Sequence, residues 1–386
     1  MKIIVIGAGM YVTGRNNSGV GTVLSSLSQL SKELEIEKVT VAAKSKSSSK
    51  SVENAINKIN SKLESSLIVD YYQLKDNNLE SLFGIDDYDC IIIATPDNLH
   101  YQQALLSLQN NLNVLCVKPL VANTDENRNL INLQTEKNLL GMVEYHKRYD
   151  EANLYTKKII NEGFLGDILY FQVDYSQRIE IPMKTFIGWV ESTNIFQYLG
   201  VHYVDLFYFL TGYIPDRLSA YATNGTLKEN GINAYDSVHV SIIWKRSDGG
   251  ECITVLNTNW IDPKCTSALS DQKYRLVGTN GRIENDHKNR GIELVSNKSK
   301  IQHPNPYFSD YIFDANGNYK FYGYGYQSIR QFILDVKDVK SGHFKISYFE
   351  SKRPTFKEAM ISTAVIESVN KSIENNSNWE SINAQI

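Results

Sequence analysis

Short apolar runs alternate with stretches of helical pattern over the first 146 residues, and this alternation limits the possible folds more than any other feature. It predicts βαβ units and therefore an α/β fold with a doubly wound parallel sheet. Ligands of such sheets lie beyond the carboxyl ends of the strands, so residues that directly follow a run are candidate site residues. The predicted strands are Ile3 to Ile6, Val39 to Ala42, Leu67 to Asp70, Asp89 to Ala94, Val114 to Val117 and Met142 to Tyr145.

The pattern changes after about Arg148, where longer strands with alternating polar and apolar residues follow a helix expected from Asp150 to Asn161. Such alternation is typical of an antiparallel sheet with one covered face. The predicted strands are Ile168 to Tyr175, Val238 to Trp244, Ile253 to Trp260 and Tyr274 to Val277. A chain of 386 residues is too long for one compact core, so we expect two domains, 1–147 and 148–386.

Two more helices are predicted near the end, at Gln327 to Val339 and from Thr355 onward. The second follows Pro354 and opens with Thr355-x-x-Glu358, the pattern of a capping box.

Charge and cysteine content exclude several classes of protein. A net charge of −3 gives no sign of a nucleic-acid partner or a basic membrane-binding face. The first apolar run has only four residues before Gly7, too few for a signal or spanning segment, so we expect a cytoplasmic protein. The four cysteines show no C-x-x-C pairing; we expect reduced thiols and no metal site.

Gly7-Ala8-Gly9 follows the first strand directly. A dinucleotide fold needs glycines there for a tight turn and for close approach of the backbone to a pyrophosphate. The third glycine of the usual motif is missing, and position 12 is valine. A plain glycine turn is the alternative interpretation.

An expanded loop is expected from Tyr11 to Val20, before a helix that begins near Gly19 and whose amino end would receive the pyrophosphate. Gly7, Gly9, Met10 and Arg15 are the expected cofactor-binding residues of this region.

The second strand ends in Ala42-Ala43-Lys44-Ser45-Lys46, without the acid that usually binds the ribose 2′-hydroxyl of NAD. Lys44 would tolerate or attract a 2′-phosphate, which favours NADP over NAD. Lys44 could equally be a solvated loop charge.

Lys118 follows the strand Asn113 to Val117, which Pro119 ends because proline cannot donate a ladder hydrogen bond. A cation at the carboxyl edge of a parallel sheet is placed for a ligand. The alternative interpretation of Lys118 is a solvated loop lysine that binds no ligand.

Taken together, these motifs resemble the Gfo/Idh/MocA oxidoreductase family, in order and over nearly the whole chain. The matching motifs are Ala94-Thr95-Pro96-x-Asn98-x-His100, Val117-Lys118-Pro119-Leu120, Gly166-Asp167, Gly200-Val201-His202-Tyr203-Val204-Asp205-Leu206, Gly278-Thr279-Asn280-Gly281 and a closing helix with Ala364, Glu367 and Ser368.

The resemblance implies an N-terminal Rossmann domain and a C-terminal α/β domain. The large open, mainly antiparallel sheet of the second domain would serve substrate binding and the contacts of a homodimer or homotetramer. It also implies hydride transfer between NAD or NADP and a hydroxyl or keto carbon of a sugar, a polyol or a nucleotide-linked sugar. Thr95, Pro96, Asn98 and His100 would line the nicotinamide, and Lys118 would contact both cofactor and substrate.

His202 would be the general acid/base, a task suited to histidine, while Lys118 would stabilise the developing alkoxide. Without the motifs, His202 would be interpreted as a half-buried helix residue. Family members usually carry Asp four residues before this histidine and Glu before Lys-Pro; this chain has Tyr198 and Val117. We therefore expect Tyr198 to bind the sugar or join the proton relay, and Lys118 to be less neutralised.

Lys147 and Arg148 follow the sixth strand and are candidates for substrate or phosphate contacts. They could equally neutralise acids at the domain junction. The aromatic run 321–326 could stack on a sugar, although packing is the better interpretation.

Two other functions remain open. One is a regulator that binds NAD(P) without turnover. The other is an enzyme whose tightly bound NAD is used twice, giving net isomerisation, hydrolysis or elimination.

Overall fold

The computed structural model describes residues 1–386 except 15–20, 76–78, 299 and 386. The chain divides into two compact units that interleave along the sequence. The first consists of Met1–Val121, Asp125–Asp150 and Pro306–Ala359, and the second of Ala122–Thr124, Glu151–Asn305 and Met360–Ile386. The first unit therefore includes residues 306–359, whereas the sequence pattern predicts them in the domain 148–386.

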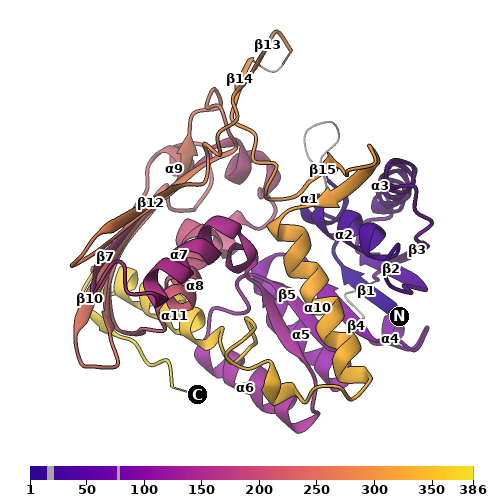
Figure 1. Cartoon of the computed structure of the whole chain (residues 1–386), viewed down its shortest axis with the longest axis horizontal. Coiled ribbons are helices and arrows are strands. Elements are labelled where there is room, and N and C mark those ends of the chain that lie inside the picture. Colours follow the sequence, from indigo (N-terminus) through magenta and orange to yellow (C-terminus); the bar gives the residue numbers. More distant parts are fainter. Residues whose placement is uncertain (15–20, 76–78, 299, 386) are drawn as a thin grey trace. The chain divides into compact units, whose positions relative to one another are not determined.

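In the described part of the chain, six parallel strands form the sheet of the first unit, in the order β3-β2-β1-β4-β5-β6 (Figure 1). This order confirms the predicted doubly wound Rossmann sheet. The strands are β1 (Lys2–Ile6), β2 (Lys38–Ala43), β3 (Val69–Gln73), β4 (Cys90–Ile93), β5 (Asn113–Val117) and β6 (Gly141–Glu144).

The strand β3 lies later than the predicted Leu67 to Asp70. The reason is its register: Val39 pairs with Val69, and the Val39 N–H donates to the Ile68 carbonyl. Leu67 is buried in the hydrophobic core of the unit rather than in the ladder.

Helices cover the sheet of the first unit because its central strands are apolar on both faces. One cluster of buried residues joins the sheet to α2, α3 and α10, and α5 packs on β4 and β5. The helices are α1 (Met10–Thr13), α2 (Thr22–Leu30), α3 (Ser48–Leu63), α4 (Glu80–Phe83), α5 (His100–Gln109), α6 (Thr124–Glu136) and α10 (Tyr324–Lys340). The strands β15 (Asp310–Phe313) and β16 (Tyr319–Tyr322) pair antiparallel.

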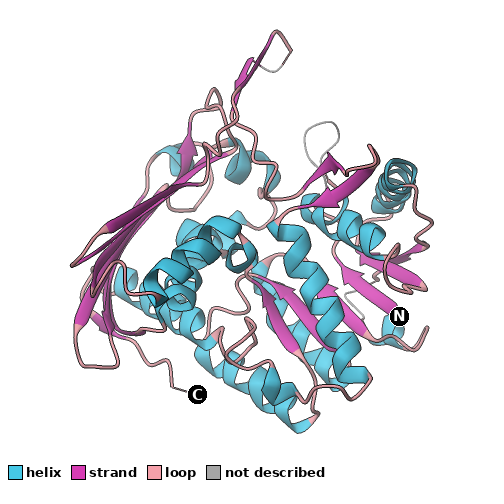
Figure 2. Ribbon diagram, in the orientation of Figure 1, coloured by secondary structure: helices cyan, strands magenta, loops and turns pink. Residues whose placement is uncertain are grey.

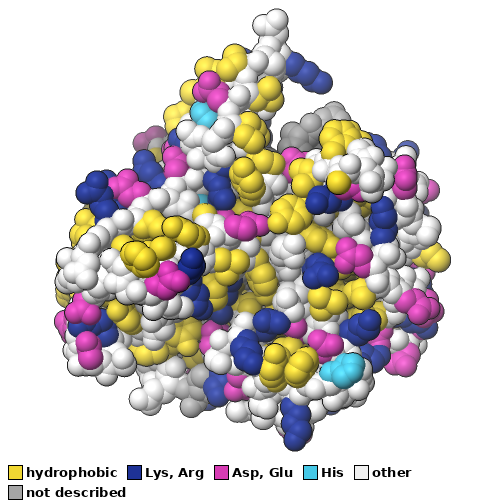
Figure 3. Space-filling view, viewed as in Figure 1, with side chains coloured by type: hydrophobic (Ala, Val, Ile, Leu, Met, Phe, Trp, Pro, Cys, Tyr) yellow, Lys and Arg dark blue, Asp and Glu magenta, His cyan; other side chains and the backbone are white. Residues whose placement is uncertain are grey.

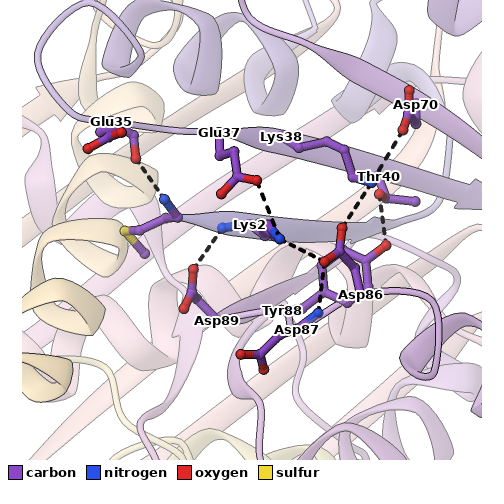
Figure 4. Close-up of polar contacts among 11 residues, drawn as sticks. Lys2, Glu35, Glu37, Lys38, Thr40, Asp70, Asp86, Asp87, Tyr88 and Asp89 are labelled. Atoms are coloured by element: carbon purple, nitrogen blue, oxygen red, sulfur yellow. Dashed lines mark hydrogen bonds and ion pairs between the residues drawn. The ribbon is translucent and has the colours of Figure 1, made fainter.

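Charged residues join β1 and β2 near their amino ends, away from the edge where ligands are expected (Figure 4). The Asp86 carboxylate forms ion pairs with Lys2 Nζ at 2.8 Å and with Lys38 Nζ at 3.1 Å. These hydrogen bonds, that of Lys2 first, lower the pKa of the Asp86 carboxyl to about 2. The carboxylate therefore stays ionised as a fixed bridge between the two strands.

The last helix begins later than its capping box predicted. The Glu358 N–H does donate to Thr355 Oγ1 (3.3 Å), but α11 (Met360–Glu374) starts two residues after Glu358. The backbone at Thr355 instead forms an antiparallel bridge with Met142 of β6, so it is not helical. The Glu358 carboxylate pairs with Arg148 at 3.1 Å.

The second unit is built on a mixed sheet with the order β12-β11-β7-β10-β9-β8-β17, counted within the residues that the structure covers. Among the pairings of the described residues, β7 with β10 is the parallel one and the others are antiparallel, which agrees with the predicted, mainly antiparallel sheet. The strands are β7 (Ile168–Arg178), β8 (Ile214–Thr223), β9 (Ser237–Lys245), β10 (Glu251–Asp262), β11 (Ser270–Gly278), β12 (Arg282–Asp286) and β17 (Glu380–Ser381).

The helices of the second unit are α7 (Glu151–Asn161), α8 (Val201–Thr211), α9 (Thr226–Glu229) and α11. Helices pack on the sheet and leave its other face open, as the strands of Figure 2 show. The hairpin of β13 (Leu294–Ser296) and β14 (Lys300–Gln302) projects from the unit, with exposed hydrophobic side chains along it (Figure 3). None of the helices described has the length and apolar character needed to cross a membrane.

A buried ion pair fixes the late segment within the first unit. Asp335 of α10 is almost fully buried. Its carboxylate accepts hydrogen bonds from Arg353 Nε at 2.6 Å and from Nη2 at 3.1 Å. Removing one partner of such a pair leaves the other charge uncompensated.

We therefore predict that Asp335→Ala lowers the free energy of unfolding by about 3 kcal/mol. Chemical denaturation followed by circular dichroism measures the change. The matched control is Asp338→Ala, three residues later on the same helix, where the side chain is more exposed. Equal stability of the two variants would show that the ion pair does not hold the segment.

Candidate functional site

The turn after β1 requires glycine at its first position. Gly7 has a φ of +107°, its N–H donates to the Ala42 carbonyl (2.8 Å), and a Cβ there would collide with the Ala94 carbonyl oxygen. Gly9, by contrast, has open space where a Cβ would stand. The backbone is thus accessible at Gly9, as close approach of a pyrophosphate requires.

The segment after Gly9 differs from the expected loop. The helical turn α1 begins at Met10 directly after Gly9, and Gly14 ends it with a φ of +84°. The longer helix α2 begins at Thr22, later than the start predicted near Gly19. Gly21 precedes it because a Cβ there would collide with the backbone of α1. Arg15, an expected cofactor residue, lies outside the described residues.

Lys44 lies on the exposed loop that follows β2. The Tyr71 hydroxyl donates to the Ala43 carbonyl (3.0 Å) and also contacts the Ser45 carbonyl, which fixes the backbone at this edge. An exposed ammonium and serine hydroxyls therefore stand where an NAD-specific site would carry a carboxylate.

The loop after β4 carries Thr95 and Pro96, both half-buried, and the exposed Asn98. The Thr95 hydroxyl donates to Gln103 Oε1 (2.6 Å), which ties the loop to α5. These three residues follow β4 at the carboxyl edge of the sheet, as predicted.

His100 lies beneath this loop, with none of its surface exposed. Its Nδ1 is 2.7 Å from the Pro119 carbonyl oxygen, and its Nε2 is 2.9 Å from the Thr95 carbonyl oxygen. Burial lowers the pKa of the imidazole, although Asp97 and the two carbonyls oppose this. His100 thus joins the loops after β4 and β5 and positions Thr95 and Lys118.

Lys118 is half-buried at the carboxyl end of β5. Burial lowers the pKa of its ammonium to about 7, while the charges of Asp97 and Glu144 raise it. A lysine in this state can donate a strong hydrogen bond or exchange a proton near neutral pH.

Glu144 is a site residue that sequence reasoning missed. It ends β6, it is the register partner of Val117, and it is only 2% exposed. A carboxylate therefore acts on Lys118 from the neighbouring strand, although position 117 itself is valine. The signal was its place at the end of a predicted strand, beside the strand that Lys118 follows.

Lys147 and Arg148 lie on a 3₁₀ turn (His146–Tyr149) and are buried. Arg148 Nη1 pairs with Glu358 at 3.1 Å, as the charge-neutralising interpretation predicts. Within the aromatic run, Phe321 and Tyr326 belong to the core of the first unit, which favours the packing interpretation.

In the second unit, Tyr198 and His202 lie on one continuous helical segment. A π-helical turn (Phe196–Gly200) runs into α8, and such turns are frequent at functional sites. His202 is 4% exposed. Tyr198 is half-buried, with its ring centroid 4.8 Å from that of Phe186 and 5.9 Å from that of Trp189.

A polar pocket of about 400 Å³ opens in the second unit. Amide and charged side chains line it, including Asn194, Gln197, Lys228 and Glu374, and such groups suit a hydroxylated ligand. Neither Tyr198 nor His202 belongs to the lining, although Gln197 of the same helical segment does.

Comparison with known families identifies both parts of the chain. The family model for oxidoreductases with an NAD-binding Rossmann fold matches residues 1–145. The model for the GFO/IDH/MocA C-terminal domain matches residues 154–284.

Among curated relatives, the scyllo-inositol 2-dehydrogenase (NADP(+)) IolW of Bacillus subtilis is 29% identical over 171 residues, 43% of this chain and 46% of the relative. The 2,7-anhydro-N-acetylneuraminate hydratase of Mediterraneibacter gnavus is 24% identical over 159 residues, 40% of this chain and 41% of the relative. The chain thus spans less than half the length of these relatives.

A solved structure extends the likeness over the whole fold. Scyllo-inositol dehydrogenase from Lactobacillus casei, crystallised with bound NAD(H) and scyllo-inositol, matches with a TM-score of 0.69 at 13% identity, and the match covers 98% of each chain. Since both domain models match in order and the fold agrees, the chain belongs to the Gfo/Idh/MocA oxidoreductase family.

Proposed function

We propose that this protein is an NAD(P)-dependent oxidoreductase that transfers hydride between the nicotinamide and a hydroxyl or keto carbon of a sugar, a polyol or a nucleotide-linked sugar. The observation that carries the proposal is Lys118, a half-buried lysine with a pKa of about 7 at the carboxyl edge of a dinucleotide-binding sheet. Such a perturbed group at a ligand-binding edge is typical of an active site.

The first unit has the backbone and side chains to hold the cofactor. The turn with Gly7 and Gly9 would receive the pyrophosphate, a role that the open space at Gly9 supports, and Thr95, Pro96 and Asn98 would line the nicotinamide. The bound nicotinamide would accept or supply the hydride. The second unit would then bind the substrate and provide the contacts between subunits.

In this proposal, Lys118 and His202 act on the same substrate oxygen. Lys118 donates a hydrogen bond that stabilises the negative charge developing on that oxygen, and His202 takes the hydroxyl proton. Tyr198, on the helical segment of His202, orients the sugar or relays the proton. Lys147 would add a substrate contact, and so would Arg148, with its charge partly balanced by Glu358.

We infer a preference for NADP over NAD. The exposed Lys44 and the absence of a carboxylate in the sequence from Ala42 to Lys46 support it. The name of the IolW relative, which specifies NADP(+), points the same way.

A second candidate function is a net hydration or elimination in which tightly bound NAD is used twice. The similarity to a hydratase of an anhydro sugar supports it. Cofactor that copurifies and is not consumed would distinguish this function from a dehydrogenase. A regulator without turnover is less well supported, since both Lys118 and His202 are retained.

We expect a cytoplasmic homodimer or homotetramer without nucleic-acid or membrane partners. Exposed apolar side chains on the sheet of the second unit, such as Tyr221 and Leu169, support assembly. The free thiols, three of them buried, suit a reducing compartment.

We predict that Lys118→Ala and His202→Asn each lower kcat by at least about a hundredfold, because each removes a group that acts on the reacting oxygen. The assay follows the absorbance of reduced nicotinamide across sugars, polyols and nucleotide-sugars. Lys158→Ala and His343→Ala, which change exposed residues, are the controls. Full turnover in both site variants would refute the proposed function.

We predict that Tyr198→Phe lowers kcat/KM about tenfold, because it removes a phenol that orients the substrate or relays a proton. The control is Tyr221→Phe, which removes a hydroxyl from a ring that is 61% exposed. Unchanged kinetics in the Tyr198 variant would leave its ring with a packing role only.

We predict that Lys44→Ala lowers the ratio of kcat/KM for NADP to that for NAD about tenfold, equivalent to about 1.4 kcal/mol of binding. Lys50→Ala, at an exposed position on α3, is the control. An unaltered ratio would mean that Lys44 is a solvated loop charge.

A further inference from the structure

The carboxyl edge of the first sheet carries a buried carboxylate for which the reaction described above gives no role. Glu144 ends β6 and is the register partner of Val117, the residue that precedes Lys118. Side chains of register partners on neighbouring strands point to the same face of the sheet. Glu144 therefore stands beside the backbone that leads into Lys118.

His146 anchors one side of this carboxylate. The Nδ1 atom of His146 is 2.9 Å from Glu144 Oε2, so that nitrogen carries the proton it donates. The imidazole is itself held by rings of the late segment: its centroid is 5.5 Å from that of Tyr324, in a stacked arrangement, and 5.0 Å from that of Phe308. Glu144 is thus fixed by a group that cannot easily rotate.

The other carboxylate oxygen has a different environment. Oε1 of Glu144 is buried and has no hydrogen-bond partner in the part of the chain that the structure describes. Burying a carboxylate oxygen without a hydrogen bond raises the free energy of the folded protein unless a positive charge lies near. Lys118 supplies that charge, because the charge of Glu144 acts directly on its ammonium.

Two carboxylates of the first unit act electrostatically on Lys118, and Lys118 acts on His100. The carboxylates of Asp97 and Glu144 favour its charged form, and Lys118 in turn disfavours a charge on His100. Burial favours the neutral amine, and it is the largest effect on the pKa of Lys118. Both carboxylates therefore counteract the effect of burial and raise the protonated fraction of the lysine near neutral pH.

We propose that Glu144 is a positioning residue that keeps Lys118 protonated and oriented toward the substrate oxygen, and that His146 is its anchor. The inference rests on the proposed function, in which Lys118 donates a hydrogen bond to that oxygen. The strand β6 thus provides from its end the carboxylate that position 117 lacks.

The test measures the ionisation of Lys118 without turnover. The rate at which acetic anhydride acetylates Lys118, followed by peptide mass spectrometry as a function of pH, reports the pKa of its amine. Glu144→Gln keeps the size of the side chain and removes its charge, so we expect this pKa to fall by about one pH unit. Glu136→Gln, the same change at an exposed position on α6, should leave it as in the wild type.

A second variant protects the test against a general loss of structure. Val117→Glu combined with Glu144→Gln places a carboxylate on the partner position of the neighbouring strand. We expect this double variant to return the pKa of Lys118 toward the wild-type value. A Lys118 pKa that is the same in wild type and Glu144→Gln, with both proteins folded, overturns the inference.

Activity separates this inference from the proposed function. Turnover that needs protonated Lys118 falls as pH rises through its pKa, so the alkaline limb of kcat/KM should move to lower pH in Glu144→Gln. If acetylation shows the fall in pKa but no sugar or polyol is turned over, the inference holds and the proposed function fails. If the Glu144→Gln variant turns over a sugar or polyol, but neither the alkaline limb of kcat/KM nor the pKa of Lys118 moves, the proposed function holds and the inference fails.

Discussion

The parallel register of β4, β5 and β6 is the constraint on which the site in the first unit depends. Each of these strands is buried along most of its length, on both faces. Its apolar side chains are therefore removed from water only in a sheet that is covered on both faces. In a parallel sheet all carboxyl ends meet at one edge. That geometry brings the loop with Thr95, the lysine after β5 and the carboxylate that ends β6 together, although they are far apart in sequence.

Local sequence patterns predicted the strands and the carboxyl edge of the sheet. They could do so because an apolar run, or a proline that ends it, determines the backbone within a few residues. Lys118 could be found in this way, since Pro119 marks the end of its strand. Glu144 was missed although it lies in a predicted strand, because its relation to Lys118 depends on the pairing of Val117 with Glu144 between two strands. The displaced β3 and the delayed start of α11 have the same cause: pairing with distant backbone overrode the local pattern.

The interleaving of the two units also escaped prediction. Nothing in the helical pattern of Gln327 to Val339 says which core it joins; the answer lies in its contacts with α2 and in the Asp335–Arg353 pair. The wider stretch 306–359 also provides the rings around His146, those of Phe308 and Tyr324. A stretch that the sequence assigns to substrate binding thus supports, in the fold, the electrostatics of the cofactor-side lysine.

The buried imidazole of His100 has one more consequence. A neutral ring carries a single N–H, so it can donate to only one of the two carbonyl oxygens that face it. The other ring nitrogen faces its carbonyl oxygen without a proton between them. The same imidazole therefore contacts the backbone of the loop that carries Thr95 and the backbone of Pro119, the residue that follows Lys118.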